Sequence, residues 1–272
     1  MGLGFKYHVV TIAAIFFALT IGLVVGSLYA SPRVPQTTIQ AIEALKRAQG
    51  TLDQNNRDLK LDRDQLQNVL HQTLPFALHN RLTGRSIAIL QSDDNEEALT
   101  EVHNALTEAG AHVLSITEID RPFGQPDDLL VPRLKGLHST TPKAPADRSE
   151  LARAVASILK KGDDTTSPLM PILHDAGLLH FDSESSYSQP VSAVIVLTGD
   201  QSAASSVVDN VDIPLISAMN DLSLAVFACQ PQGVVSSRFT QYRQAHLTVQ
   251  TIEKVDTDPG KWQLVMALGD NR

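Results

Sequence analysis

Two short groups of side chains in this sequence have the chemistry to bind a ligand. In the first group, Met170 and His174 stand four residues apart and His180 follows soon after. If residues 168–179 form a helix, Met170 and His174 share one face, because residues four apart on a helix are neighbours. Thioether and imidazole groups are ligands of copper ions. These three residues are the candidate metal site; a packed methionine with two surface imidazoles is the alternative.

The second group is the segment Thr198, Gly199 and Asp200, which directly follows the apolar run 193–197. In open α/β sheets, ligands bind in the crevice beyond the carboxyl ends of the strands. The position of the three residues therefore predicts a crevice for a small molecule. A tight turn between a strand and a helix explains the same residues without any ligand.

Other reactive residues and motifs are few. The single cysteine, Cys229, ends the apolar run 224–229, where a lone cysteine usually packs as a small apolar side chain. The sequence has no Gly-x-Gly-x-x-Gly or phosphate-binding Gly-Lys-Ser/Thr loop, no Gly-x-Ser-x-Gly elbow and no His-Glu-x-x-His pair. We therefore expect that the chain is not an enzyme and that it has no certain cofactor, copper being the one candidate.

A domain over residues 80–272 must position these groups. Short apolar runs separated by segments with helical periodicity favour an α/β fold with a mostly parallel open sheet covered by helices. We expect the first helix of this domain to begin with Asp93 and Glu96, which have capping-box spacing. The proline-rich segment 121–146 is expected to be a surface loop. The expected strands are 86–90, 112–116, 193–197, 224–229, 247–250 and 263–268.

The N-terminal region reads as a membrane anchor. After a tail of residues 1–8, the run 9–30 contains no charged residue and no proline. Such a run is long enough for a transmembrane helix, which needs ~20 apolar residues. A cleaved secretory signal is the alternative, with cleavage after Ser27. Lys6 on one side and Arg33 on the other do not decide the orientation.

Small residues recur at every fourth position of this apolar run: Ala14, Ala18, Gly22 and Gly26. Helices associate in lipid through close packing, which small side chains permit. The row therefore predicts a helix–helix interface, in which Gly22 and Gly26 form a Gly-x-x-x-Gly motif and the helices cross near Gly22.

A helical stalk is expected over residues 36–74. Leucines recur every seven residues, at Leu45, Leu52, Leu59 and Leu66. This heptad seam is typical of a coiled coil, and together with the anchor it predicts a parallel homodimer. The alternative is a solvated helix that packs on its own domain through the same stripe. Pro75 is expected to end the pattern.

The net charge argues against nucleic acid as a partner. The chain carries 22 basic and 30 acidic residues, a formal charge of −8. Nucleic-acid-binding domains present a basic face instead. The expected partners are the membrane, a second copy of the chain and other proteins of the cell envelope.

Three stretches together resemble one known family. FKYHVVTIAAIFFALTIGLVVGS, RLTGRSIAIL and VDTDPGKWQLVMAL are similar to the membrane segment, the domain entry and the C-terminal signature of the mycobacterial copper-transport protein B (MctB-like) family. The resemblance implies a membrane protein of copper transport or homeostasis. We expect a single-pass protein of the cell membrane with residues 80–272 outside the cytoplasm. A structural adaptor of the cell envelope without metal chemistry is the alternative, and an α/β enzyme or ligand sensor is a third hypothesis.

Overall fold

The computed structural model describes residues 3–30, 36–93, 95–120, 122–125, 127–138, 145–163, 169–199, 207–235 and 237–271. Two compact units divide the chain, Met1–Asp64 and Gln65–Arg272. The helices and strands follow one another along the chain as α1 (Leu3–Ala30), α2 (Gln36–Leu78), β1 (Ser86–Gln91), α3 (Glu96–Glu108), β2 (His112–Ile119), α4 (Asp127–His138), α5 (Arg148–Lys161), α6 (Leu169–Asp175), β3 (Leu179–Phe181), β4 (Ala193–Leu197), the π-helix η2 (Val208–Asp212), α8 (Ile213–Asp221), β5 (Ala225–Cys229), α9 (Phe239–Gln244), β6 (Gln250–Ile252) and α10 (Asp258–Asp270).

The first unit is helical. Within α1, the segment Tyr7–Tyr29 has a mean hydropathy of 2.6 and is long and apolar enough to cross a membrane. Its length fits a bilayer core about 30 Å thick at 1.5 Å per residue. Helix α2 begins at Gln36, as the heptad pattern predicts, and runs through Pro75 to Leu78.

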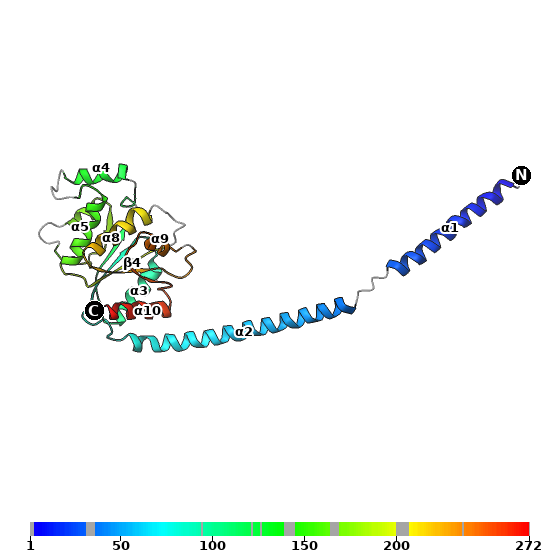
Figure 1. Cartoon of the computed structure of the whole chain (residues 1–272), viewed down its shortest axis with the longest axis horizontal. Coiled ribbons are helices and arrows are strands. Elements are labelled where there is room, and N and C mark those ends of the chain that lie inside the picture. The colour runs from blue at the N-terminus through cyan, green and yellow to red at the C-terminus, as the bar shows by residue number, and fades with distance from the viewer. Residues whose placement is uncertain are drawn as a thin grey trace. The chain divides into compact units, whose positions relative to one another are not determined.

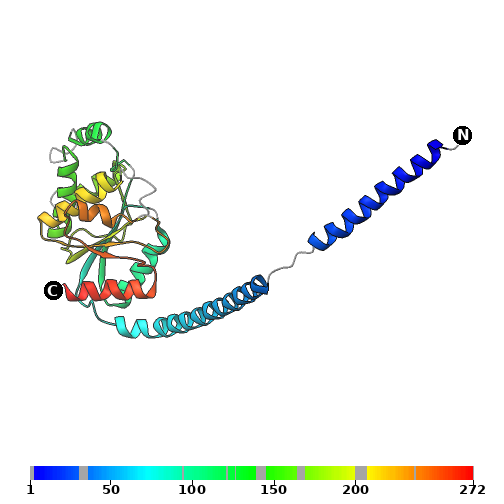
Figure 2. The same ribbon diagram turned by 45° about the vertical axis from the view of Figure 1, so that its right-hand side comes forward.

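The second unit combines a sheet with covering helices (Figure 1). Its six-stranded sheet has the order β3-β2-β1-β4-β5-β6. Strands β2, β1, β4, β5 and β6 are parallel, and only β3 at the edge is antiparallel to its neighbour. The predicted class, a mostly parallel open α/β sheet covered by helices, is confirmed. Seen from a second direction, the twisted sheet has helices above and below it (Figure 2).

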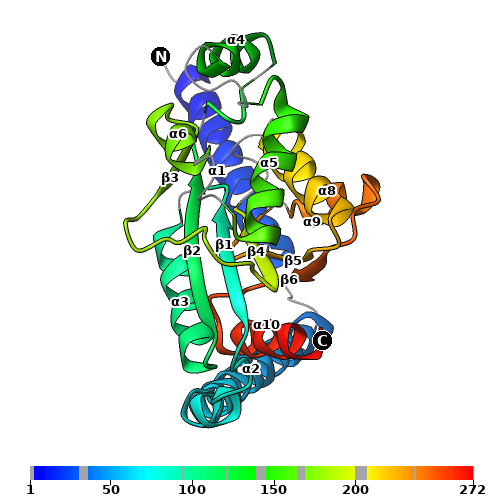
Figure 3. The ribbon, with the colours of Figure 1, turned by 90° about the vertical axis from the view of Figure 1, so that its left-hand side faces the viewer.

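Each face of the sheet has its own apolar core, because successive side chains of a strand point to opposite faces. On one face, Leu90 and Val194 pack among side chains of α5, α8 and their neighbours. On the other face, Ile89 and Ile195 pack with α3, α10 and the end of α2. Figure 3 shows this layering, with α5 and α8 on one side and α3 and α10 on the other. Since β1 and β4 are buried on both faces, residues 87–90 of β1 and all of β4 are apolar.

Local sequence sets the ends of the main helices. The side chain of Asp147 caps α5 by accepting a hydrogen bond from the Glu150 N–H at 2.8 Å. Gly162 ends the same helix with φ of +64°, a left-handed conformation that suits glycine. The cap of α3 is Asn95, whose side chain accepts from the Ala98 N–H, so the prediction that Asp93 caps this helix is wrong. Asp93 has another role, described below.

Three sequence expectations for the domain are corrected by the structure. The segment 263–268 is not a strand but part of α10, which Thr257 caps and in which the buried Leu264 and Leu268 are four residues apart. The proline-rich segment 121–146 contains helix α4, where Leu130 and Leu134 are buried at the same helical spacing. Pro75 does not end α2, because Leu74 and Leu78 on either side are anchored in the core.

Candidate functional site

The centre of the sheet has the strand order at which open α/β sheets bind ligands. The chain leaves β1 toward β2 on one side, whereas β4 is followed by β5 and β6 on the other. The carboxyl ends of β1 and β4 therefore form a topological switch point, where doubly wound sheets bind their ligands. Thr198 and Gly199 directly follow β4 at this point, and their role in binding a ligand stays a prediction. Asp200, the third predicted residue, lies outside the described residues.

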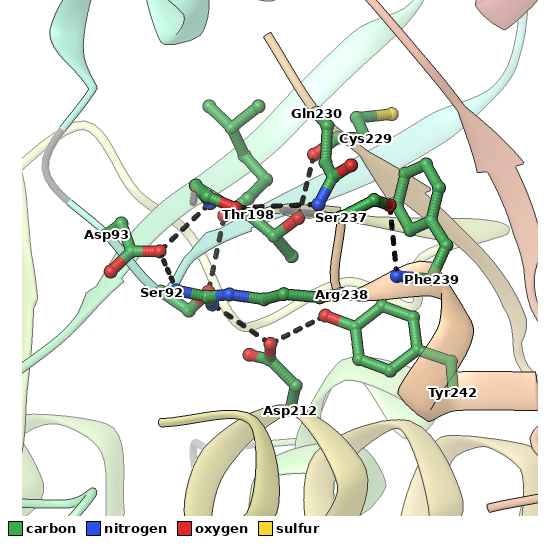
Figure 4. Close-up of polar contacts among 12 residues, drawn as sticks. Ser92, Asp93, Thr198, Asp212, Cys229, Gln230, Ser237, Arg238, Phe239 and Tyr242 are labelled. Atoms are coloured by element: carbon green, nitrogen blue, oxygen red, sulfur yellow. Dashed lines mark hydrogen bonds and ion pairs between the residues drawn. The ribbon is translucent and has the colours of Figure 1, made fainter. Parts of the chain in front are cut away.

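A buried arginine, Arg238, donates hydrogen bonds to several side chains at this point (Figure 4). Arg238, just before α9, has no exposed surface. Its Nη1 donates to Ser92 Oγ and to Asp212 Oδ2, each at 3.1 Å, and its Nη2 donates to Asp93 Oδ2. Because a buried cation is costly without partners, this guanidinium is held by two carboxylates and a hydroxyl. The side chain links the end of β1 to the end of η2.

Asp212 is the fully buried anion of this cluster. Its Oδ2 accepts from Arg238 and from the Tyr242 hydroxyl, the latter at 2.6 Å. Its Oδ1 has no partner among the described residues, and the same is true of Arg238 Nε. Asp212 ends the π-helix η2, an uncommon element that is frequent at functional sites.

Burial and charge shift three ionisation equilibria here. Burial raises the pKa of Asp212, and the charge of Arg238 with the hydrogen bond from Tyr242 opposes only part of that effect. Burial also raises the pKa of Tyr242, and the negative charge of Asp212 adds to it, so the phenol stays protonated and donates. Burial disfavours the charged guanidinium of Arg238, but Asp212 and Asp93 outweigh it and its pKa is raised.

The outer end of the cluster is the carboxylate of Asp93, whose side chain is 23% exposed. Besides Arg238, its Oδ2 accepts from the backbone N–H of Gly199 at 2.9 Å. The carboxylate lies so close that a Cβ on residue 199 would stand 2.8 Å from Oδ2. Gly199 is therefore required by this contact. The side-chain amide of Gln230, after β5, donates a hydrogen bond to the Gly199 carbonyl oxygen at 3.4 Å.

Sequence reasoning singled out Thr198 and Gly199 but missed most of the side chains around them. Asp212, Arg238 and Tyr242 form no recognised motif, and they come from two elements that the fold brings together. The available signal was the four-residue spacing of Arg238 and Tyr242, which places both on one face of a short helix.

Of the three candidate metal ligands, the structure brings His174 and His180 together, and metal binding by them stays a prediction. The rings of His174 and His180 lie 5.1 Å apart between centroids, and His174 is also 4.9 Å from Phe181. His174 Nδ1 is buried and has no partner among the described residues. Met170 is fully buried in the core on the α5 side of the sheet. Within the part of the chain that the structure describes, no three His, Cys, Asp or Glu side chains are grouped to hold a metal ion.

Cys229 packs as a small apolar side chain in the core at the end of β5. Burial raises the pKa of its thiol far above the ordinary range. The thiol is therefore protonated at physiological pH and is a poor nucleophile and metal ligand.

The predicted helix interfaces lie on the surface of the chain. All four small residues of the anchor are within α1, and a Cβ on Gly22 or Gly26 would meet no atom within 4 Å. The seam leucines of α2 are exposed: Leu45 71%, Leu52 62%, Leu59 65% and Leu66 70%. A coiled coil through these leucines stays a prediction.

Comparison with known proteins decides the family. A family model described as copper transport outer membrane protein, MctB, matches residues 3–272. The chain belongs to this family. The match spans the anchor, α2 and the whole α/β domain, which confirms the resemblance seen in the sequence. No curated protein matches the chain.

One similar solved structure is a mitochondrial ornithine carbamoyltransferase from Coccidioides immitis, with 9% identity and a TM-score of 0.22. The alignment covers 66% of this chain and 58% of that enzyme.

Proposed function

We propose that this MctB-family protein acts in copper transport or homeostasis as a single-pass membrane protein whose α/β domain lies outside the cytoplasm. The observation that carries the proposal is the match to the copper-transport family over residues 3–272. The apolar segment Tyr7–Tyr29 supports the membrane anchor by its length and composition.

A deletion strain tests this function. We expect loss of the gene to change the growth of the cells in added copper, and to leave growth in added zinc and under detergent stress unchanged. Zinc and detergent are the controls, because a weakened envelope would make cells sensitive to all three. Equal sensitivity to all three would instead support the structural adaptor, which the exposed leucine seam of α2 favours.

Direct copper binding is the first testable prediction. His174 and His180 are adjacent, and imidazole nitrogens are good copper ligands. We expect the purified full chain in detergent to bind Cu(II) saturably by isothermal titration. His174→Ala and His180→Ala should each weaken binding more than about tenfold, a loss of about 1.4 kcal/mol or more.

Two variants serve as controls for this titration. His103→Ala removes another imidazole whose Nδ1 is buried without a partner among the described residues, and it should leave binding unchanged. Met170→Leu keeps the core volume and shows whether the thioether takes part in binding. Absence of saturable binding, or binding that survives removal of both His174 and His180, would remove this pair from the mechanism.

Self-association is the second prediction. Helices in lipid gain little from apolar burial and associate through close contact of small residues. We propose that α1 pairs in parallel through the row of small residues that includes Gly22 and Gly26, with the two helices crossing near Gly22. Gly22→Ile with Gly26→Ile should weaken association of the anchor in a membrane reporter assay, because the added side chains hold the helices apart.

The matched control carries Leu19→Ile and Leu23→Ile, which change residues outside the row.

In the stalk, Leu52→Asp should reduce the dimer fraction of the full chain in detergent, measured by analytical ultracentrifugation. Leu61→Asp should not, since Leu61 is equally exposed, at 60%, but lies off the seam. Association that is the same in the seam and off-seam variants would exclude this interface.

A further inference from the structure

The crevice at the β1–β4 switch point is already filled by polar groups of the chain. In doubly wound sheets, this position binds the anionic part of a ligand with backbone N–H groups and a positive side chain. Here a backbone N–H of Gly199 and the guanidinium of Arg238 point at the same oxygen, Asp93 Oδ2. The two donors of an anion site are present, and one carboxylate of the chain accepts from both.

The neighbouring helix N-terminus is closed to an anion as well. Helix α3 follows β1 and is the helix whose first N–H groups would face a phosphate in such a fold. Its N-cap Asn95 accepts from the Ala98 N–H at 3.0 Å, and Glu96 and Glu97 stand in its first turn. The helix dipole is thus balanced by the chain's own acidic residues, which would repel a second negative charge.

The described residues pack closely against the inner side of the Asp93 carboxylate, whose side chain is 23% exposed. Gly199 leaves no room for a Cβ beside the carboxylate, and Arg238 behind it is fully buried. Arg238 is fixed in turn by Asp212 and Ser92. The guanidinium therefore cannot turn toward an outside ligand without leaving the Asp212 carboxylate buried and unpaired, which is costly.

We infer that this crevice is an anion site that the chain fills itself, with the carboxylate of Asp93 in the place of a bound carboxylate or phosphate. The domain keeps the ligand-binding geometry of its fold but takes no nucleotide or other anion there. The hydrogen bonds of this site connect the ends of β1 and β4 to the segment leading into α9. This inference does not depend on copper binding.

Removal of the internal ligand should create a site for an external one. Asp93→Gly lacks a methylene and a carboxylate, and acetate supplies an equivalent methyl and carboxylate. We expect the full-length variant in detergent to unfold at a lower temperature than the wild type in sodium chloride. Sodium acetate of equal ionic strength should raise that midpoint saturably, with half-saturation at about millimolar concentration. Unfolding is followed by fluorescence of the single tryptophan, Trp262.

Two variants and the wild type act as controls. Asp127→Gly removes a carboxylate that also pairs with a mostly buried arginine, Arg148, but that is 72% exposed itself. Asp93→Asn keeps the shape of the side chain and removes its charge. Neither variant should respond to acetate more than to chloride, and nor should the wild type, because each lacks an emptied anion site.

A saturable acetate response in Asp93→Gly, and in none of the controls, supports the inference. If Asp93→Gly is unfolded in chloride, recovery of folded protein on refolding in acetate supports it equally. The inference is overturned if acetate acts no better than chloride on Asp93→Gly. It is also overturned if the wild type or Asp93→Asn responds as strongly, because the crevice would then be open.

Discussion

Replacement of Arg238 by methionine should lower the free energy of unfolding of the full chain by about 3–5 kcal/mol. The guanidinium is the only charge partner of the fully buried Asp212 among the described residues. Without it, the carboxylate keeps the Tyr242 hydroxyl but remains an uncompensated buried anion. Urea unfolding in detergent, followed by Trp262 fluorescence, measures this loss. Arg243→Met in the following helix α9, at an exposed position, should change stability by less than about 0.5 kcal/mol.

The loss caused by Arg238→Met should also depend on pH. Because burial raises the pKa of Asp212, its carboxyl group binds a proton more tightly in the folded chain than in the unfolded chain. The contribution of that proton to stability is fully present below the ordinary pKa of aspartate and is lost as pH rises through the raised value. Without Arg238 the pKa should rise further, so the destabilisation should shrink from neutral pH toward about pH 5. A loss that is equal at both pH values would contradict an uncompensated carboxylate.

Substitution of Gly260 by alanine should cost about 3 kcal/mol or more, at the upper end of overpacking effects. Gly260 lies in the first turn of α10, and a Cβ there would stand 2.0 Å from the Lys254 carbonyl oxygen and 2.9 Å from Val255 Cα. Both contacts are to backbone, so no side-chain rotation relieves them. The Lys254 carbonyl is held further by hydrogen bonds from Thr257 N–H and Oγ1. The turn and the helix would have to separate.

The matched control is in the same helix. A Cβ on Gly269 would meet no atom within 4 Å, so Gly269→Ala should leave stability unchanged or raise it by up to about 1 kcal/mol. Thermal and urea unfolding of both variants in detergent give the comparison. Similar stability of Gly260→Ala and Gly269→Ala would show that the close approach of α10 to residues 254–255 does not constrain the fold.

The central strands were predictable because burial on both faces makes their sequences continuously apolar. Residues 87–90 of β1 and all of β4 and β5 are apolar. The segment 263–268 has a similar composition, yet it forms a helix because Thr257 caps it and Pro259 starts it. A short apolar run does not by itself distinguish a strand from a buried helix.

The position of Thr198 and Gly199 at the end of a strand could be predicted from the sequence, but the charged side chains around them could not. Thr198 and Gly199 follow β4, and strand ends in an α/β sheet have a known use. Arg238, Asp212 and Asp93 are far apart in the sequence, and each resembles an ordinary surface charge there. Only the fold shows that Arg238 and Asp212 are fully buried and that all three are joined. Asp93 was assigned to a helix cap because its spacing to Glu96 also fits a capping box.

The most direct test of the account is the copper content of cells, because the central claim is a membrane-anchored protein of copper homeostasis. Metal analysis would compare the parent strain with a deletion strain carrying no copy, the full chain, or residues 36–272 behind a cleavable secretion signal. We predict that deletion changes cellular copper and not zinc, and that only the full chain restores it. Unchanged copper after deletion would contradict the function. Restoration by the secreted, unanchored copy would contradict the membrane anchor.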